Sequence, residues 1–185
     1  ISDQITNLNR KPAEVQLLYH CNYGAPILEE GATVVAPFKT VSPRDARAQE
    51  DMNTYDEFAG PKPGYVEQVY FYEPTGKRGS RDTAVLLKNA DGSLGSSLHF
   101  SLKQMPCFSL WKNTAATEDG YVTGLEPATN YPNPKRFERD AGRVVSLEGG
   151  ETRKYDLTVA VHDTRKAVQE IERQIKQLQK VAKPR

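Results

Sequence analysis

Hydrophobic and polar residues alternate along most of the chain in short runs, and turn-forming residues separate these runs. Alternation over about four to eight residues predicts half-buried β-strands, because successive side chains of a strand point to opposite faces of a sheet. The clearest run, residues 65–72, is rich in aromatic and β-branched residues, which suit a pleated surface. Strands are expected at residues 4–8, 14–19, 33–36, 65–72, 84–88, 96–102, 107–112, 121–125, 143–147 and 155–161.

Two polar stretches between these strands indicate how the strands connect. Residues 42–63 have no apolar period and predict a long surface loop, with one helical turn after Pro43. Residues 89–92 contain an Asp-Gly step, whose glycine supplies the positive φ of a tight hairpin turn. No helix long enough for a parallel crossover lies between the strands. Residues 1–162 are therefore expected to form an all-β domain, an antiparallel sandwich or barrel.

The end of the chain has a different period. After Asp163, a plausible N-cap, apolar residues recur three and four positions apart and predict an amphipathic helix within residues 163–185. This apolar stripe consists of Val168, Ile171, Ile175, Leu178 and Val181. The stripe either packs on the protein's own sheet or joins a partner. Two heptads are too few to argue for a coiled coil, which favours the first reading.

Composition narrows the function classes. The chain has 185 residues, which suits one domain or a large piece of a bigger one. A net charge of +1 argues against nucleic acid or an anionic membrane as a partner. Cys21 and Cys107 lack metal-site spacing and are expected to be reduced thiols. With no long apolar run and no signal-peptide pattern at the first residues, a soluble, cytoplasmic protein is expected.

Candidate chemistry lies in three segments where titratable groups stand among aromatic and turn residues, namely 19–24, 105–113 and 124–132. His20 follows an apolar strand, where a loop is expected to open. Glu126 stands between Leu125 and Pro127 at an expected strand end, where removal of water would raise its pKa and suit a general base. Trp111, the only tryptophan, offers a flat face for a sugar ring. Each residue also has a plain structural reading, as a core histidine, a solvated carboxylate or a core tryptophan.

Three motifs, together with Asn7, resemble the aldose 1-epimerase (galactose mutarotase)-like proteins. They are LLYHCNYG at 17–24, LEP at 125–127 and LEGGET at 147–152, and the last is common and weak. The resemblance covers residues 3–161 and implies a galactose mutarotase-like supersandwich, of which this chain would be the C-terminal part, because members are usually about twice as long. It further implies that the missing half supplies an arginine and a second histidine to the site, and that nothing in this chain stands in for them.

The resemblance implies His20 and Glu126 as the catalytic pair of a sugar-anomer interconversion. Glu126 would take the proton of the anomeric hydroxyl and protonated His20 would give one to the ring oxygen, with no metal and no cofactor. The ligand would be a monosaccharide or a sugar acid. Expected lining residues are Asn22, Glu67, Gln104, Trp111, Lys112, Asn113 and Asn130. Glu67 would bind sugar hydroxyls, and Lys112 would favour an anionic sugar.

Two alternatives from other classes remain open. A non-catalytic carbohydrate-binding or sensor protein would keep the pocket without accelerating anomer exchange. An assembly module would use the C-terminal helix to form a homo-oligomer and would leave the pocket vestigial. The sequence does not name the sugar.

Overall fold

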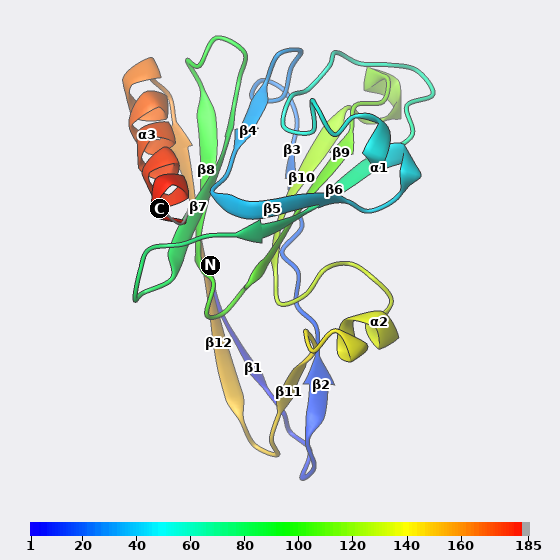
Figure 1. Cartoon of the computed structure of the whole chain (residues 1–185), viewed down its shortest axis with the longest axis vertical. Helices are drawn as coiled ribbons and strands as arrows, with labels where there is room; N and C mark the ends of the chain where they lie inside the picture. The colour runs from blue at the N-terminus through cyan, green and yellow to red at the C-terminus, as the bar shows by residue number, and fades with distance from the viewer. Residues whose placement is uncertain (183–185) are drawn as a thin grey trace.

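The computed structural model describes residues 1–182, with side chains described through residue 180. Its body consists of two five-stranded antiparallel sheets that face each other (Figure 1). The first sheet has the order β1 (Ser2–Thr6), β12 (Thr152–His162), β8 (Gly95–Ser101), β7 (Asp82–Lys88), β4 (Thr33–Val35). The second has the order β3 (Cys21–Tyr23), β10 (Val122–Ala128), β9 (Cys107–Asn113), β6 (Gln68–Pro74), β5 (Phe38–Pro43). These sheets confirm the predicted antiparallel sandwich.

Smaller elements complete the chain. β2 (Ala13–Val15) and β11 (Val145–Leu147) pair in a two-stranded sheet, which lies with the ends of β1 and β12 below the main body in Figure 1. The helices are α1 (Ala46–Glu50), α2 (Lys135–Asp140) and α3 (Arg165–Ala182), with a short 3-10 turn at Thr117–Asp119. No helix in the described part of the chain is both long and apolar enough to cross a membrane.

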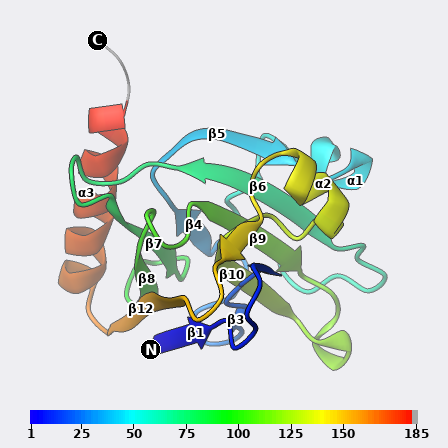
Figure 2. The same cartoon turned by 90° about the horizontal axis from the view of Figure 1, so that it is seen from below.

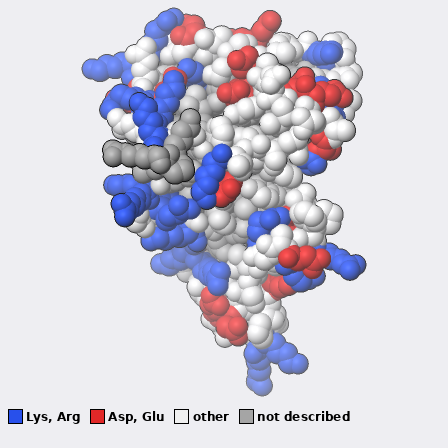
Figure 3. All heavy atoms as spheres, in the orientation of Figure 1, with Lys and Arg blue, Asp and Glu red and all other residues white. Residues whose placement is uncertain are grey.

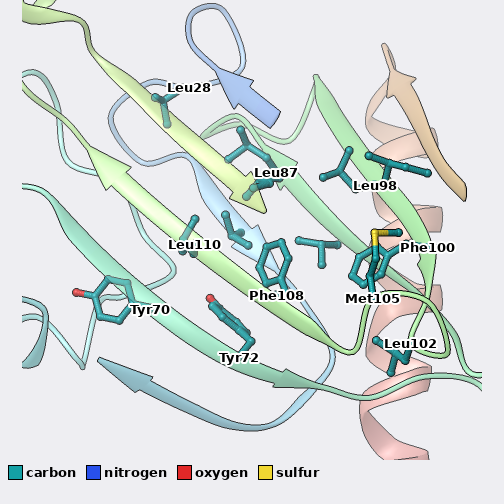
Figure 4. Packing of buried hydrophobic residues seen from close by; sticks show 14 of the residues in the cluster. Leu28, Tyr70, Tyr72, Leu87, Leu98, Phe100, Leu102, Met105, Phe108 and Leu110 are labelled. Atoms are coloured by element: carbon teal, nitrogen blue, oxygen red, sulfur yellow. The ribbon is translucent and has the colours of Figure 1, made fainter. Parts of the chain in front are cut away.

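The core fills the space between the sheets (Figure 4). Alternate residues of each strand point inward, so both sheets bury one apolar face against the other. The largest inward side chains of the second sheet are Tyr70, Tyr72, Phe108, Leu110 and Leu125. The opposite residues of those strands point to the outer face, where the site lies.

The hairpin predicted at residues 89–92 is confirmed. It joins β7 to β8, whose register pairs Lys88 with Gly95, and Gly92 adopts a φ of 68°. The helical turn predicted after Pro43 is also confirmed as α1, and Asp45 caps it by accepting from the backbone N–H of Ala48. The surroundings of α1 correct one expectation, because Ala48 and Phe58 are buried in the core and residues 42–63 are not wholly a surface loop.

β10 is longer than predicted, and its proline explains an interruption in the neighbouring strand. It continues through Pro127 to Ala128 instead of ending at Leu125. The backbone N–H of Tyr19 donates to the carbonyl of Pro127, but proline has no N–H to return the bond. Regular pairing with β10 therefore breaks between the Leu18–Ala128 bridge and β3. The single strand expected at residues 14–19 is wrong, since β2 ends at Val15 and pairs elsewhere.

The C-terminal helix is present and lies on the outer face of the first sheet (Figure 2). Val168, Ile171 and Ile175 are buried against β7, and Leu178 is half-buried, whereas the side chain of Val181 falls outside the described residues. This packing matches the reading in which the stripe covers the protein's own sheet. Asp163 does not act as the predicted N-cap, because the Thr164 hydroxyl accepts the N–H of Ala167 instead. Figure 3 shows Lys and Arg gathering on the side where α3 lies.

Candidate active site

His20 and Glu126 meet on the outer face of the second sheet. The Leu18–Ala128 bridge and the β3–β10 ladder share one register, which places His20 directly opposite Glu126. Facing residues of antiparallel strands are close neighbours. His20 Nε2 lies 2.9 Å from Glu126 Oε1. The Glu126 side chain is 5% exposed and that of His20 is 45% exposed. Glu126 is therefore shielded from solvent, whereas His20 is accessible to solvent and to a ligand.

Gly124 provides the space in which this pair meets. It lies two residues before Glu126 on the same face of β10, where its register partners are Asn22 and Trp111. A Cβ built on Gly124 would lie 2.9 Å from Glu126 Oε1 and 3.0 Å from His20 Cε1. Any larger residue would push the two groups away from their present positions.

A second polar group adjoins the pair. The Trp111 ring packs edge-on against His20, with centroids 5.3 Å apart. Its Nε1 donates to Glu67 Oε2 at 2.7 Å, and Arg44 donates to the other oxygen of Glu67 at 3.1 Å. Arg44 also donates to Asp45. Side chains from β3 to β5 thus form one continuous network across the sheet.

Arg44 corrects the sequence interpretation, which placed no arginine of this chain in the site. It follows directly on β5, and its backbone N–H donates to the carbonyl of Val69, so the strand pairing fixes its position. The signal in the sequence was a Pro-Arg-Asp step inside an apparent polar loop. Because the expected loop had no register, that step could not be aligned with β6 or β9.

The two carboxylates of the cluster have opposite electrostatic settings. Burial, and secondly the charge of Glu67, raise the pKa of Glu126 to about 7, whereas Arg44 acts in the other direction. The hydrogen bond from Trp111 is the largest cause that holds the pKa of Glu67 below its ordinary value; burial acts against it, and the hydrogen bond from Arg44 adds to it. Such divergence separates a group that stays ionised from one that can exchange a proton near neutrality.

The structure also explains why Glu126 is dry. The sequence predicted Glu126 at the end of a strand, but Glu126 lies inside β10. Ser109 faces it from β9. The segment after β10 turns back over this face of the sheet. There Tyr131 stacks on Phe71, with ring centroids 4.7 Å apart. Glu126 is thus buried within the sheet, between neighbouring strands.

Four of the predicted site residues come together, and two more lie nearby. His20, Glu126, Trp111 and Glu67 form the network. Asn22 is exposed on β3, opposite Gly124. Asn113 lies two residues after Trp111 and so shares its face of β9.

The other three predicted lining residues are not brought to this face. Lys112 follows Trp111 and therefore points the other way, where its Nζ donates to the carbonyls of Thr54 and Glu57 and burial lowers its pKa to about 8. The suggestion that Lys112 favours an anionic sugar thus loses its structural basis. Gln104 pairs with Asp156 of the first sheet. Asn130 is buried beyond the end of β10 and donates to the neighbouring carbonyl at position 131.

The remaining motif has a structural role. Asn7 is buried, and its Nδ2 donates to the carbonyls of Leu147 and Glu148. Asn7 therefore connects the end of β1 to the turn at residues 147–152. In the described part of the chain, no group of three or more His, Cys, Asp or Glu side chains could hold a metal ion.

The fold is a galactose mutarotase-like β-sandwich. The structure is similar to that of a putative aldose 1-epimerase from Klebsiella pneumoniae, with a TM-score of 0.94 and 35% identity, covering 96% of this chain and 46% of that one. A galactose mutarotase-like protein from Clostridium acetobutylicum shares the fold at a TM-score of 0.60 and 14% identity, covering 88% and 52%. Another from Lactobacillus casei does so at 0.54 and 13%, covering 87% and 58%. These findings confirm the predicted fold and resemblance.

The family follows from the sequence itself. Residues 1–161 match the family described as a domain of unknown function, DUF4432, and the chain belongs to that family. None of the curated proteins compared with the sequence matches it. The chain spans about half the length of the solved structures it resembles, between 46% and 58% of them.

Proposed function

We propose that this chain carries an acid/base pair that interconverts the anomers of an aldose by opening and reclosing the sugar ring. The observation that carries the proposal is the 2.9 Å contact between His20 Nε2 and Glu126 Oε1, with the pKa of Glu126 raised to about 7. A carboxyl group poised near neutrality is suited to general base catalysis. The 35% identical Klebsiella pneumoniae protein, described as a putative aldose 1-epimerase, supports the same reaction class.

The geometry suits ring opening because both oxygens that exchange protons are bonded to the same carbon. The anomeric hydroxyl and the ring oxygen both belong to C1, so the base and the acid must lie close together, as His20 and Glu126 do. Ionised Glu126 takes the hydroxyl proton and protonated His20 gives a proton to the ring oxygen. As the carbonyl forms at C1, the bond from C1 to the ring oxygen breaks. Rotation about the C1–C2 bond and the reverse proton transfers give the other anomer.

The rest of the face supports binding of a sugar. Trp111 lies beside His20, and its ring offers an apolar surface for sugar C–H groups. Its indole N–H is already bonded to Glu67, so the ring and not the N–H is available to a ligand. Asn22 and Asn113 lie on the same side of the sheet and are suited to hydroxyl groups. The proposed ligand is a monosaccharide or sugar acid in the cytoplasm.

A non-catalytic carbohydrate-binding role on the same face is the second candidate. It is favoured by the Trp111 ring and the exposed Asn22 on this face, which suit contacts with a sugar that need no proton transfer. The assembly role of the C-terminal helix has less support, because α3 uses Val168, Ile171 and Ile175 to cover its own sheet. A homo-oligomer remains compatible with either candidate.

Anomer exchange measured by NMR saturation transfer tests the proposal on a panel of aldoses and uronates. The rate above spontaneous mutarotation is expected to fall by about 10²- to 10⁴-fold in Glu126→Gln, the usual contribution of a positioned acid or base. Glu73→Gln is the matched control, since Glu73 is an exposed, ion-paired glutamate on β6. Binding without acceleration for every sugar would instead establish the non-catalytic candidate.

A further inference from the structure

Both carboxylate oxygens of Glu67 accept a hydrogen bond from another side chain. One oxygen accepts from Trp111 Nε1 at 2.7 Å and the other from Arg44 at 3.1 Å. These two donors fix the orientation of the carboxylate between Trp111 and Arg44. The contacts of Glu67 therefore indicate a positioning task beyond the hydroxyl binding that the resemblance implies.

We propose that Glu67 is a positioning residue, which Arg44 fixes in place and which holds Trp111 against His20 so that the imidazole faces Glu126. Its consequence for catalysis rests on the proposed function, whereas the placement of Trp111 does not. The network runs from Arg44 beside β5, through Glu67 and Trp111, to His20 beside β3.

His20 needs such support because its backbone is incompletely paired. Pro127 cannot donate to Tyr19, so the ladder beside His20 lacks one hydrogen bond. The His20 side chain is also 45% exposed, so packing restrains it on one side alone. The edge of the Trp111 ring provides that restraint at a centroid distance of 5.3 Å. The indole ring can provide it only while its own orientation is fixed by Glu67.

Glu67 also acts on Glu126 through its charge. The titratable and charged groups that act on Glu126 are His20 beside β3, Glu67 before β6, Arg44 after β5 and Cys21 on β3. The charge of Glu67 raises the pKa of Glu126, and that of Arg44 lowers it. A substitution that removes the charge but keeps an acceptor therefore separates this electrostatic effect from the hold on Trp111.

Two substitutions at Glu67 make this separation. Glu67→Gln keeps an acceptor oxygen for Trp111 and removes the charge, whereas Glu67→Leu removes both. Glu73→Gln on β6, the strand that begins directly after Glu67, is the matched control, because it removes an exposed, ion-paired carboxylate. Because Glu67 is partly exposed at the surface, both variants are expected to fold.

The single tryptophan makes the first readout independent of activity. Trp111 gives the only indole N–H resonance in a nitrogen-15 spectrum. That resonance is expected to stay close to the wild-type position in Glu67→Gln and in the control, and to move to the solvent-exposed position in Glu67→Leu. The ionisation midpoint of Glu126 is expected to fall to lower pH in Glu67→Gln. An indole resonance that does not move in Glu67→Leu would overturn the proposal.

Kinetics provide the second readout, with the sugar that the wild-type protein turns over. Glu67→Leu is expected to lower kcat by about tenfold or more, since misplacement of a catalytic group is costly, while KM changes little. A raised KM at unchanged kcat would assign Glu67 to direct sugar binding and overturn the positioning role. If the wild-type protein accelerates no anomer exchange but the indole resonance moves as expected, the proposed function fails and the placement of Trp111 by Glu67 stands.

Discussion

The outer faces of the two sheets differ in the side chains they present and in what covers them. The first sheet presents Ala84 and Leu86, which α3 covers with Val168, Ile171 and Ile175. The second sheet presents Glu126 and Trp111 beside His20, and no comparable helix seals them in the described part of the chain. Strand alternation creates both faces equally. The outward residues therefore decide whether a face becomes a second core or remains a titratable surface.

The histidines show the same contrast. On the first sheet, His99 and His162 each place Nε2 2.8 Å from the hydroxyl of Ser97, and burial lowers the pKa of both rings. The Ser97 hydroxyl thus joins His99 on β8 and His162 on β12 in one hydrogen-bonded cluster. His20 instead faces a carboxyl group whose pKa is raised and keeps its other side open to solvent. The group that a histidine contacts, and not the histidine alone, therefore separates a structural role from a candidate acid.

The covered face is expected to show the largest effect on stability. Ile175→Ala removes a buried side chain between α3 and β7 and should lower the free energy of unfolding by about 2–4 kcal/mol. Urea denaturation measures this loss, with the exposed Val161→Ala as control. The indole resonance of Trp111 should not change. A shift of that resonance would contradict the independence of the two faces.

The open face is expected to show the reverse effect, a gain of stability on substitution. The pKa of Glu126 rises from 4.5 to about 7 on folding, so the folded protein loses stability as pH increases between these values. Glu126→Gln carries no such penalty and should be more stable above pH 7 by up to about 3 kcal/mol, less the value of the lost contact with His20. Urea denaturation at pH 8 and pH 5 tests this, since the gain should shrink at pH 5. A variant less stable at pH 8 would show that His20 fully compensates the charge.

A substitution at Gly124 is expected to move His20 and Glu126 without changing either side chain. The Cβ of Gly124→Ala would crowd Glu126 Oε1 and His20 Cε1, both of them ends of flexible side chains. Anomer exchange is expected to fall about tenfold or more, because misplaced catalytic groups lose much of their effect. The free energy of unfolding should change by less than about 1 kcal/mol. Unchanged exchange would show that the present contact is not the productive arrangement.

Much of the fold could be predicted from local pattern. The alternation at residues 65–72 and the Asp-Gly step before β8 depend on neighbouring residues alone. The strand is present but shifted to Gln68–Pro74, and the hairpin is confirmed. The break beside His20 could not be predicted, because it depends on Pro127 lying opposite Tyr19, far along the chain. The burial of Phe58 within an apparent surface loop also needs the surrounding strands.

The site was predictable only in part for the same reason. His20 and Glu126 were predicted as a pair through the resemblance to the aldose 1-epimerase-like proteins, and the strand register places them together. The prediction for Lys112 is wrong because Lys112 is adjacent to Trp111 on β9. Adjacent residues of a strand point to opposite faces, so Lys112 points away from the site. Arg44 was missed because only the pairing of β5 with β6 brings it to Glu67.

We propose that the outer face of the second sheet holds an acid/base pair in which the pKa of Glu126 lies near neutrality. The most direct test is a pH titration of the Glu126 carboxyl carbon by NMR, assigned by its absence from the spectrum of Glu126→Gln. We expect a midpoint at about 7, with the carboxyl protonated below it and ionised above it. A midpoint close to the ordinary value of 4.5 would contradict this proposal, because Glu126 would then be fully ionised at neutral pH and would not exchange a proton near neutrality.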